Sequence, residues 1–305
     1  MSEQSFRRST SIALVDDPMA APEGDPRATV AGREVGRSGA IRWALIGAAV
    51  IYVSVLLLAP LASIVWTAIT GGFEVARHTL AQPDVRHAYF LTGVITLVTL
   101  AVAGVFGVIT ALVLTRDRFP GRRLVSAIVD LPLAVSPVIV GIMVVVLFGR
   151  GGWFESFFAA RGIQIVFALP SMVLVTMFIV LPFVIREVAP VLQELGTEEE
   201  DAARTLGASS LQAFFRVTLP NIRWALLYGL ALTMARALGE IGAVLIVSGA
   251  IQGKTETATL YIFRAIEERQ DASAYLVALT LAAASIVLLA AIEVFKRKRM
   301  KEIGR

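Results

Sequence analysis

Six long stretches of this sequence are almost free of charge, and no other feature limits the possible folds so strongly. They lie at residues 43–72, 88–114, 124–149, 163–185, 224–251 and 272–292. A helix needs roughly 20 apolar residues to cross the hydrocarbon core of a bilayer, and each stretch is long enough. Because backbone groups inside lipid must bond to one another, such stretches predict helices rather than strands. We therefore expect an all-α, polytopic membrane protein with six transmembrane helices.

The composition supports a membrane location. Charged residues make up 17% of the 305 residues and hydrophobic residues 56%, whereas a soluble domain carries about 25% charged residues. The net charge of +4 does not indicate nucleic-acid binding, because the basic residues stand beside apolar stretches without interleaved aromatic residues. The chain has no cysteine, and His78 and His87 have no third ligand nearby in the sequence. We therefore expect no metal site and no other cofactor.

Lysines and arginines are concentrated in every second connector. Most lie in the N-terminal segment, in the connectors after the second and fourth stretches, and in the C-terminal tail. Because these residues favour the cytoplasmic side of a membrane, we expect both termini in the cytoplasm. Residues 1–40 are rich in Ala, Pro, Gly, Ser and Arg and are expected to form a disordered cytoplasmic tail. Residues 41–300 would then form the transmembrane domain.

The connector at 187–222 carries signals for two short helices. Thr197 and Glu200 are spaced as a capping box, in which each side chain bonds to the backbone N–H of the other residue. This spacing predicts a helix from Glu198 to Leu206. Gly207 follows directly and suits the left-handed backbone conformation that commonly ends a helix.

A second short helix is predicted after this glycine. Ser209 and Gln212 form another possible capping box. Apolar residues then recur at helical spacing and form one stripe, at Leu211, Phe214, Phe215 and Leu219. We expect Pro220 to end this helix, so that an amphipathic pair of helices lies at the inner face of the membrane.

The same connector resembles the EAA loop of the permeases of bacterial ABC importers. In that motif Glu-Ala-Ala is followed after three residues by Gly, and after nine more by Ile, any residue, Leu and Pro. The matching residues here are Asp201, Ala202, Ala203, Gly207, Val217, Leu219 and Pro220. Asp201 stands where Glu is usual, with Glu200 directly before it, and Val217 replaces Ile. The resemblance implies cytoplasmic coupling helices, with these residues and Glu200 engaged in coupling to the ATPase subunits.

Further segments resemble the sulfate/thiosulfate importer permeases, and their W-type subunits in particular. They are residues 131–138, 148–153, 196–200 and 236–244. Molybdate permeases share much of the Arg-Ala-Leu-Gly-Glu run at 236–240, so molybdate or another oxyanion remains an alternative substrate. The resemblance implies a type I ABC importer fold in the bacterial inner membrane. It also implies partners: two ATP-binding subunits, a second permease of the T-type and a periplasmic sulfate-binding protein.

Arg236 and Glu240 stand four residues apart in the fifth stretch, so they share a helix face and can pair. Charges inside a membrane are costly and usually face protein or water. Two interpretations remain open: the pair holds a helix interface or gate, or it lines the pathway of the anion. Asp130, near the cytoplasmic end of the third stretch, is interpreted as an interfacial residue.

Two other classes of protein compete with this interpretation. A secondary transporter driven by an ion gradient often has internal repeats and broken half-helices, and the sequence contains no repeat. A membrane-embedded enzyme would need a catalytic cluster in the spans, and the sequence suggests none. The run from Gly249 to Thr255 resembles a phosphate-binding loop, but three residues separate its glycines where that motif requires four. We interpret it as an outer turn, so ATP would be hydrolysed by another chain.

Overall fold

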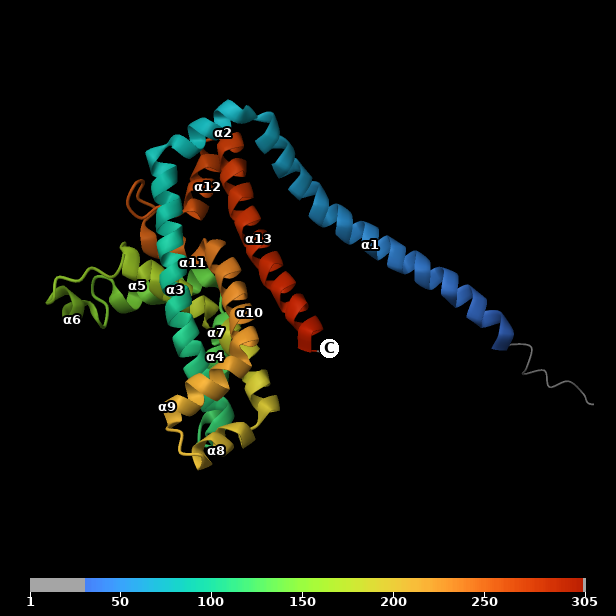
Figure 1. Cartoon of the computed structure of the whole chain (residues 1–305). Coiled ribbons are helices and arrows are strands. Elements are labelled where there is room, and N and C mark those ends of the chain that lie inside the picture. Colours follow the sequence, from blue (N-terminus) through green and yellow to red (C-terminus); the bar gives the residue numbers. More distant parts are fainter. Residues whose placement is uncertain (1–30, 304–305) are drawn as a thin grey trace, which may run out of the picture. The chain divides into compact units, whose positions relative to one another are not determined.

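The computed structural model describes residues 31–303, which form helices joined by turns and short connectors (Figure 1). The longest helices are α1 (Ala31–Thr70), α3 (Pro83–Arg116), α7 (Leu169–Leu195), α10 (Leu219–Leu238) and α13 (Asp271–Ile303). The shorter ones are α2 (Gly72–Ala81), α4 (Arg122–Ala134), α5 (Pro137–Phe148), α6 (Glu155–Ala159), α8 (Glu198–Thr205), α9 (Ser210–Ala213), the π-helical turn η1 (Phe214–Thr218), α11 (Gly242–Ser248) and α12 (Ala258–Glu267). No strand occurs within residues 31–303, which confirms the all-α prediction.

Four helices in the described part of the chain are long and apolar enough to cross a membrane. They lie at 41–70, 83–116, 169–195 and 271–291, and correspond to the first, second, fourth and sixth predicted stretches. The fourth stretch was expected at 163–185, but its helix begins at Leu169. Pro170 lies in the first turn of α7, where its missing N–H costs nothing, and α7 then continues to Leu195.

The third predicted stretch is two helices rather than one. α4 and α5 meet at an angle of 112°. Ser136, between them, has an extended backbone with φ −60° and ψ 136°. Pro137 explains this conformation, because the proline ring clashes with a helical conformation of the preceding residue. Pro137 itself begins α5, the position in a helix that best tolerates proline.

The fifth predicted stretch is also broken, between α10 and α11, with a bend of 57°. The break at residues 239–241 lies beside the break between α4 and α5. A Cβ atom on Gly242 would lie 3.2 Å from Cβ of Pro137, and one on Gly141 would lie 2.9 Å from the carbonyl oxygen of Ala243. If each bent pair is one span, the described residues form six spans, as predicted.

The chain divides into two compact units near Pro60, which lies within the first helix, α1. α1 begins at Ala31, inside the segment predicted to be a disordered tail. The rest of that predicted tail, residues 1–30, lies outside the described residues. The apolar part of α1, residues 41–70, is long enough for one span.

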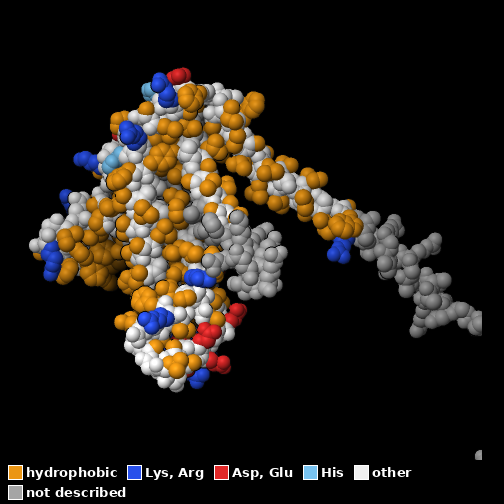
Figure 2. Space-filling view, viewed as in Figure 1, with side chains coloured by type: hydrophobic (Ala, Val, Ile, Leu, Met, Phe, Trp, Pro, Cys, Tyr) orange, Lys and Arg blue, Asp and Glu red, His pale blue; other side chains and the backbone are white. Residues whose placement is uncertain are grey.

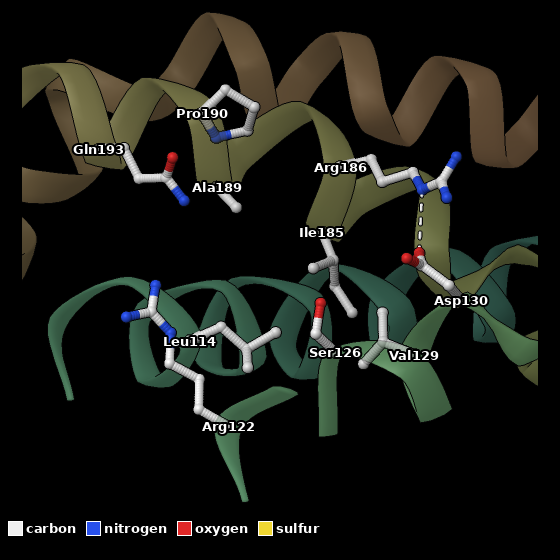
Figure 3. A pocket seen from close by; sticks show the side chains of 10 residues that line it. All are labelled: Leu114, Arg122, Ser126, Val129, Asp130, Ile185, Arg186, Ala189, Pro190 and Gln193. Atoms are coloured by element: carbon white, nitrogen blue, oxygen red, sulfur yellow. Dashed lines mark hydrogen bonds and ion pairs between the residues drawn. The ribbon is translucent and has the colours of Figure 1, made fainter. Parts of the chain in front are cut away.

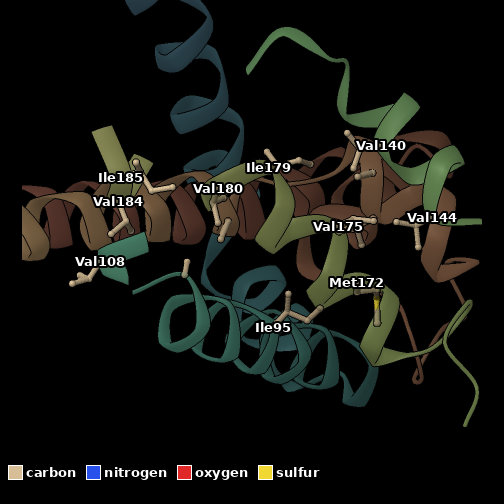
Figure 4. Close-up of a cluster of buried hydrophobic side chains, with 14 of the residues drawn as sticks. Ile95, Val108, Val140, Val144, Met172, Val175, Ile179, Val180, Val184 and Ile185 are labelled. Atoms are coloured by element: carbon tan, nitrogen blue, oxygen red, sulfur yellow. The ribbon is translucent and has the colours of Figure 1, made fainter. Parts of the chain in front are cut away.

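α7 lies at the centre of the second unit and supplies much of its core. Fully buried side chains follow one another along this helix, among them Met172, Val175, Val180, Val184, Val188 and Leu192. They pack against buried residues of α3, α5, α10 and α11. Figure 4 labels buried residues of α3 and α5 beside those of α7. Large apolar side chains elsewhere remain exposed on the surface of this bundle, and Figure 2 shows them over much of one face. Such a surface fits lipid or protein neighbours rather than water.

Two glycines let α3 and α10 approach α7 closely at Val184. A Cβ atom on Gly107 of α3 would lie 2.6 Å from Cγ1 of Val184, and one on Gly229 of α10 would lie 3.1 Å from its Cα. Small residues at such positions allow helix backbones to pack tightly in membranes, where the hydrophobic effect does not drive helices together. The contact of α7 with two neighbours therefore depends on these glycines.

This packing predicts that Gly107→Ala destabilises the protein by about 1–3 kcal/mol, the usual cost of overpacking a filled core. The change should lower the thermal unfolding temperature of the purified permease. Gly93→Ala is the matched control on the same helix, because nothing lies within 4 Å of the Cβ it would introduce. Equal unfolding temperatures for the two variants would contradict the proposed role of the close contact.

Candidate functional site

The segment from α8 to η1 forms a compact turn at the end of the bundle where α3 and α7 also end (Figure 1). α8 begins with Glu198, Glu199, Glu200 and Asp201 in its first turn. Four acidic residues favour this position because the N-terminal end of a helix carries a partial positive charge. α8 ends at Thr205, one residue earlier than the sequence predicted.

Gly207 ends α8 as predicted, with a positive φ of 89°. Its backbone N–H donates to the carbonyl oxygen of Arg204 at 2.9 Å, and the N–H of Ala208 donates to that of Ala203 at 3.0 Å. These two bonds form a Schellman motif, the common termination at a left-handed glycine. The connector between α8 and α9 therefore begins with a hydrogen-bonded turn that depends on Gly207.

The two predicted capping boxes have different outcomes. The one at Ser209 is confirmed: its N–H donates to Oε1 of Gln212 at 2.9 Å, and its Oγ accepts from the N–H of Gln212 at 3.3 Å. The one at Thr197 is wrong, because this side chain makes no capping bond. Glu200 instead accepts from Nη2 of Arg116 at 3.0 Å and from Oγ1 of Thr218 at 2.9 Å. A guanidinium is the stronger donor in a buried site, so it replaces the backbone N–H.

The predicted stop at Pro220 is also wrong. The helix runs through Pro220, from Ser210 to Leu238, and Pro220 lies in the first turn of α10. The preceding turn η1 is π-helical, with the N–H of Leu219 bonded to the carbonyl oxygen of Phe214. In a π-turn the N–H bonds to the carbonyl oxygen five residues earlier instead of four. This change of bonding falls directly before Pro220, which has no N–H to donate, and the helix continues through the proline.

Several large apolar side chains of this segment face outwards. Leu206 is 89% exposed, Leu211 71% and Phe215 59%. Phe214 and Leu219, predicted to share one stripe with them, are half-buried. These three exposed side chains leave apolar surface on the segment that a neighbouring molecule can cover.

The residues that resemble the EAA motif are distributed over this surface and its base. Asp201, Ala202, Gly207 and Pro220 are exposed, Ala203, Val217 and Leu219 are half-buried, and Glu200 is buried. Oδ1 of Asp201 pairs with Nη1 of Arg204 at 3.2 Å on the same helix. The outward-facing members therefore offer small, acidic and apolar groups, while Glu200 points into the protein.

Arg236 and Glu240 pair as their spacing predicts, with Nη1 and Oε2 2.7 Å apart. The side chain of Glu240 is 3% exposed and that of Arg236 34%. Glu240 also has a second partner that the sequence did not indicate. Its Oε1 accepts from the backbone N–H of Ala243 at 2.9 Å, so one carboxylate joins the last turn of α10 to the first turn of α11.

The break itself is supported from α12. Oγ1 of Thr259 donates to the backbone carbonyl of Glu240 at 2.8 Å. This bond satisfies a carbonyl that lacks a helical partner, which is the condition for irregular backbone inside a membrane. Gly239, placed next to a charged residue in an apolar stretch, was the available sequence signal for this break.

Sequence reasoning missed a buried acidic residue in the connector between α11 and α12. Glu256 is 1% exposed, and its two carboxylate oxygens accept from Nε and Nη2 of Arg264 at 2.7 and 3.2 Å. The hydrogen bonds to Glu256 raise the pKa of Arg264 above its usual value. The spacing of Glu256 and Arg264 does not distinguish them from exposed charged residues of a connector. Only the folded chain shows that they form a buried ion pair.

The run from Gly249 to Thr255 forms a turn held by its own side chains. Oγ1 of Thr255 donates to the carbonyl oxygen of Ser248 at 2.6 Å and accepts from the N–H of Ile251 at 3.1 Å. The threonine hydroxyl that a phosphate-binding loop would offer to a metal is thus occupied by backbone groups. This geometry agrees with the interpretation of the run as a turn.

A cavity of about 240 Å³ lies between the start of α4 and the end of α7 (Figure 3). Asp130 and Arg186 pair at one end of it, with Oδ1 and Nε 3.0 Å apart, and Arg122 and Gln193 lie at the other. Asp130 and Arg186 are each about half exposed. An exposed pair of this kind adds little stability, about 0–1 kcal/mol. The interfacial position expected for Asp130 stays a prediction.

The comparisons with known proteins define the class of this chain. Residues 103–301 match the family model of the inner membrane component of binding-protein-dependent transport systems. The chain belongs to this family of ABC transporter permeases. It has the type I importer fold: it resembles the crystal structure of a bacterial alginate ABC transporter with a TM-score of 0.72, at 18% identity, over 87% of this chain and 96% of the other.

Within this family, the chain is similar to sulfate transport system permease proteins. It is 44% identical to CysW of Synechocystis, over 85% of this chain and 94% of that protein. It is 42% identical to CysW of Escherichia coli K12, over 85% and 88%. Its identity to CysT of Salmonella typhimurium is 37%, over 83% and 91%. The higher identity to the CysW proteins confirms the resemblance to W-type subunits.

The two bonds of Glu240 predict a structural effect of Glu240→Gln. The amide oxygen can still accept from Ala243, but Arg236 loses its ionised partner. We expect fewer assembled permeases and a lower unfolding temperature. Breaking a fully buried pair lowers the free energy of unfolding by about 3–5 kcal/mol, and the loss here should be smaller because Arg236 is one-third exposed. Membrane abundance and thermal unfolding of the purified complex measure this.

Glu240→Ala, which also removes the acceptor for Ala243, should be the less stable of the two variants. A Glu240→Gln variant that assembles normally but does not transport would contradict the structural role. That outcome would place the pair in the anion pathway instead.

Proposed function

We propose that this chain is the W-type permease subunit of an ABC importer that carries sulfate or thiosulfate across the inner membrane. ATP is hydrolysed by two separate ATP-binding subunits, which dock on α8 and α9. One observation carries this proposal: a short helix pair, capped at Gly207 and Ser209, exposes Leu206, Leu211 and Phe215 at the end of the bundle. Its residues occupy the positions of the EAA motif.

The geometry of this segment suits a coupling role. α8 follows α7 directly, and α9 continues through η1 into α10. Force applied to the segment therefore reaches two core helices through continuous backbone. Small Ala202 and acidic Asp201 are exposed beside the apolar side chains, so a partner cleft can approach closely. Closure of the ATPase subunits would move this segment and switch the permease between inward and outward access.

The relatives support the choice of substrate and partners. CysW and CysT are both sulfate permease proteins, and identity to CysW is the higher of the two. This supports sulfate over molybdate or another oxyanion. It also supports a heterodimer in which a T-type paralogue is the second permease, served by a periplasmic sulfate-binding protein.

Broken half-helices, like internal repeats, are frequent in secondary transporters, and the described residues contain two broken spans. Helices α4 and α5, and α10 and α11, are bent at their junctions. Broken helices place irregular backbone next to a transport pathway in several transporter classes, so they do not separate the classes. Membership of the ABC permease family separates the two classes, and it favours the ATP-driven importer.

The arginine-rich connectors support an orientation with both termini and residues 187–222 in the cytoplasm. The native chain has no cysteine, so single cysteines test this directly. A membrane-impermeant maleimide should label Arg77→Cys in α2 of intact cells and leave Glu198→Cys in α8 unlabelled. Lysed cells should show labelling of both. External labelling at position 198 in intact cells would overturn the orientation and, with it, the docking of cytoplasmic ATPases.

The function is tested by uptake of labelled sulfate, thiosulfate and molybdate in a strain without its own sulfate permeases, expressing this chain with its partner subunits. Sulfate and thiosulfate uptake should be restored. Gly207→Val should reach the membrane but lose transport, because a residue with a Cβ pays about 1–2 kcal/mol at this left-handed position. ATP hydrolysis stimulated by loaded binding protein should fall roughly 5- to 30-fold, the factor that this energy represents.

Gly207→Asn is the matched control, since asparagine tolerates the left-handed conformation better and nothing lies within 4 Å of an added Cβ. It should keep most of the activity. Normal transport by Gly207→Val would show that the segment is not the coupling element. Uptake of molybdate alone would keep the importer and change its substrate.

A further inference from the structure

The carboxylate of Glu200 joins three elements at the base of the docking segment. Its Oε1 accepts from Nη2 of Arg116, at the end of α3, and from Oγ1 of Thr218 in η1. The side chains of Arg116 and Glu200 are only 17% and 11% exposed. Glu200 therefore faces away from any partner that covers the exposed surface of α8.

This ion pair connects α8 to a helix that it does not follow in sequence. The other described ion pair of α8, between Asp201 and Arg204, stays within the helix. Nδ2 of Asn221 also donates to Oε2 of Glu199 at 2.6 Å. Asn221 belongs to α10, however, and the backbone already joins α10 to α9 through η1. The bond to Arg116 thus adds a connection to α3 that the backbone does not supply.

α3 extends this connection through the length of the bundle. Near its middle, Gly107 packs closely on Val184 of α7. Near its other end, Oγ1 of Thr92 accepts from the backbone N–H of Ala258 at 2.9 Å, where α12 begins. Val85 and Ala88 of α3 are buried in one cluster with Tyr261 of α12. A continuous helix of 34 residues therefore joins α8 to α7 and α12.

The burial of the pair makes it sensitive to small changes. Nε of Arg116 is buried and has no hydrogen-bond partner among the described residues. The guanidinium therefore depends on Glu200 for compensation of its charge. Removing one partner of such a pair leaves a buried charge without compensation, which costs more than the pair itself contributes.

We propose that Glu200 is a positioning residue that ties α8 to Arg116 of α3 and passes the movement of the docked ATPase subunits to the spanning helices. This rests on the proposed function, in which the segment docks the ATPase subunits. Arg116 and Thr218 share this positioning role, because they are the two residues that donate hydrogen bonds to Glu200. The EAA motif specifies neither residue. Glu200 holds the docking surface in place and makes no contact with the ATPase.

The test uses the complete complex, reconstituted in proteoliposomes with binding protein. Glu200→Gln should keep the ATPase subunits bound and hydrolysing ATP, while the number of ATP molecules consumed per sulfate imported rises about tenfold, within the usual range of a coupling between two sites. Thr218→Val should raise this ratio less. Glu198→Gln, an exposed change on the same helix, is the matched control and should leave the ratio unchanged.

A rescue experiment separates a mechanical tie from a general loss of structure. Arg116→Cys combined with Glu200→Cys should raise the ratio as Glu200→Gln does, and a flexible bismaleimide that joins the two thiols should restore it. Each single cysteine treated with the same reagent should stay uncoupled.

A normal ratio in Glu200→Gln with the ATPase attached would overturn the tie, and so would failure of the formed cross-link to restore coupling. Loss of the ATPase from Glu200→Gln but not from Glu198→Gln would make Glu200 a docking contact and overturn the positioning role. A wild-type chain that never binds an ATPase would instead overturn the proposed function.

Discussion

Every polar group of the backbone inside a membrane must find a partner in the protein, and this requirement determines where the chain can leave helical geometry. Two spans are broken, at Ser136 and at residues 239–241, and the two breaks lie against each other. Glu240 and Thr259 supply bonds to the backbone there. Ser136 and Gly239 are exposed, so protein covers this irregular backbone only in part. Non-helical backbone at membrane depth occurs where it is buried in protein or lines a water-filled cavity.

The close packing of α7 depends on small residues in the neighbouring helices. Val184 lies between Gly107 and Gly229, so three helix backbones approach one another at one level of the bundle. α3 and α10 are then held by a common neighbour. The segment from α8 to η1 joins α7 to α10 and is bonded to α3 through Glu200, so it is connected to all three helices.

The segment from α8 to η1 combines apolar side chains that face outwards with an acidic side chain that faces into the bundle. Leu206, Leu211 and Phe215 face outwards and offer apolar contact area. Glu200 faces inwards and fixes the segment to the bundle. Adjacent residues of one motif therefore face in opposite directions, since Glu200 is buried and Asp201 beside it is exposed.

The sequence alone determined the class of fold, because twenty apolar residues without charge have few alternatives to a membrane helix. It also determined the end of α8 at Gly207 and the capping box at Ser209, since these depend on neighbours a few residues away. The tertiary structure decided the partner of Glu200, which the sequence had assigned to Thr197. It also decided the continuation of the helix through Pro220 and the burial of Glu256. Each of these depends on a group distant in the chain or on a change of helix type, and local spacing carries no information about either.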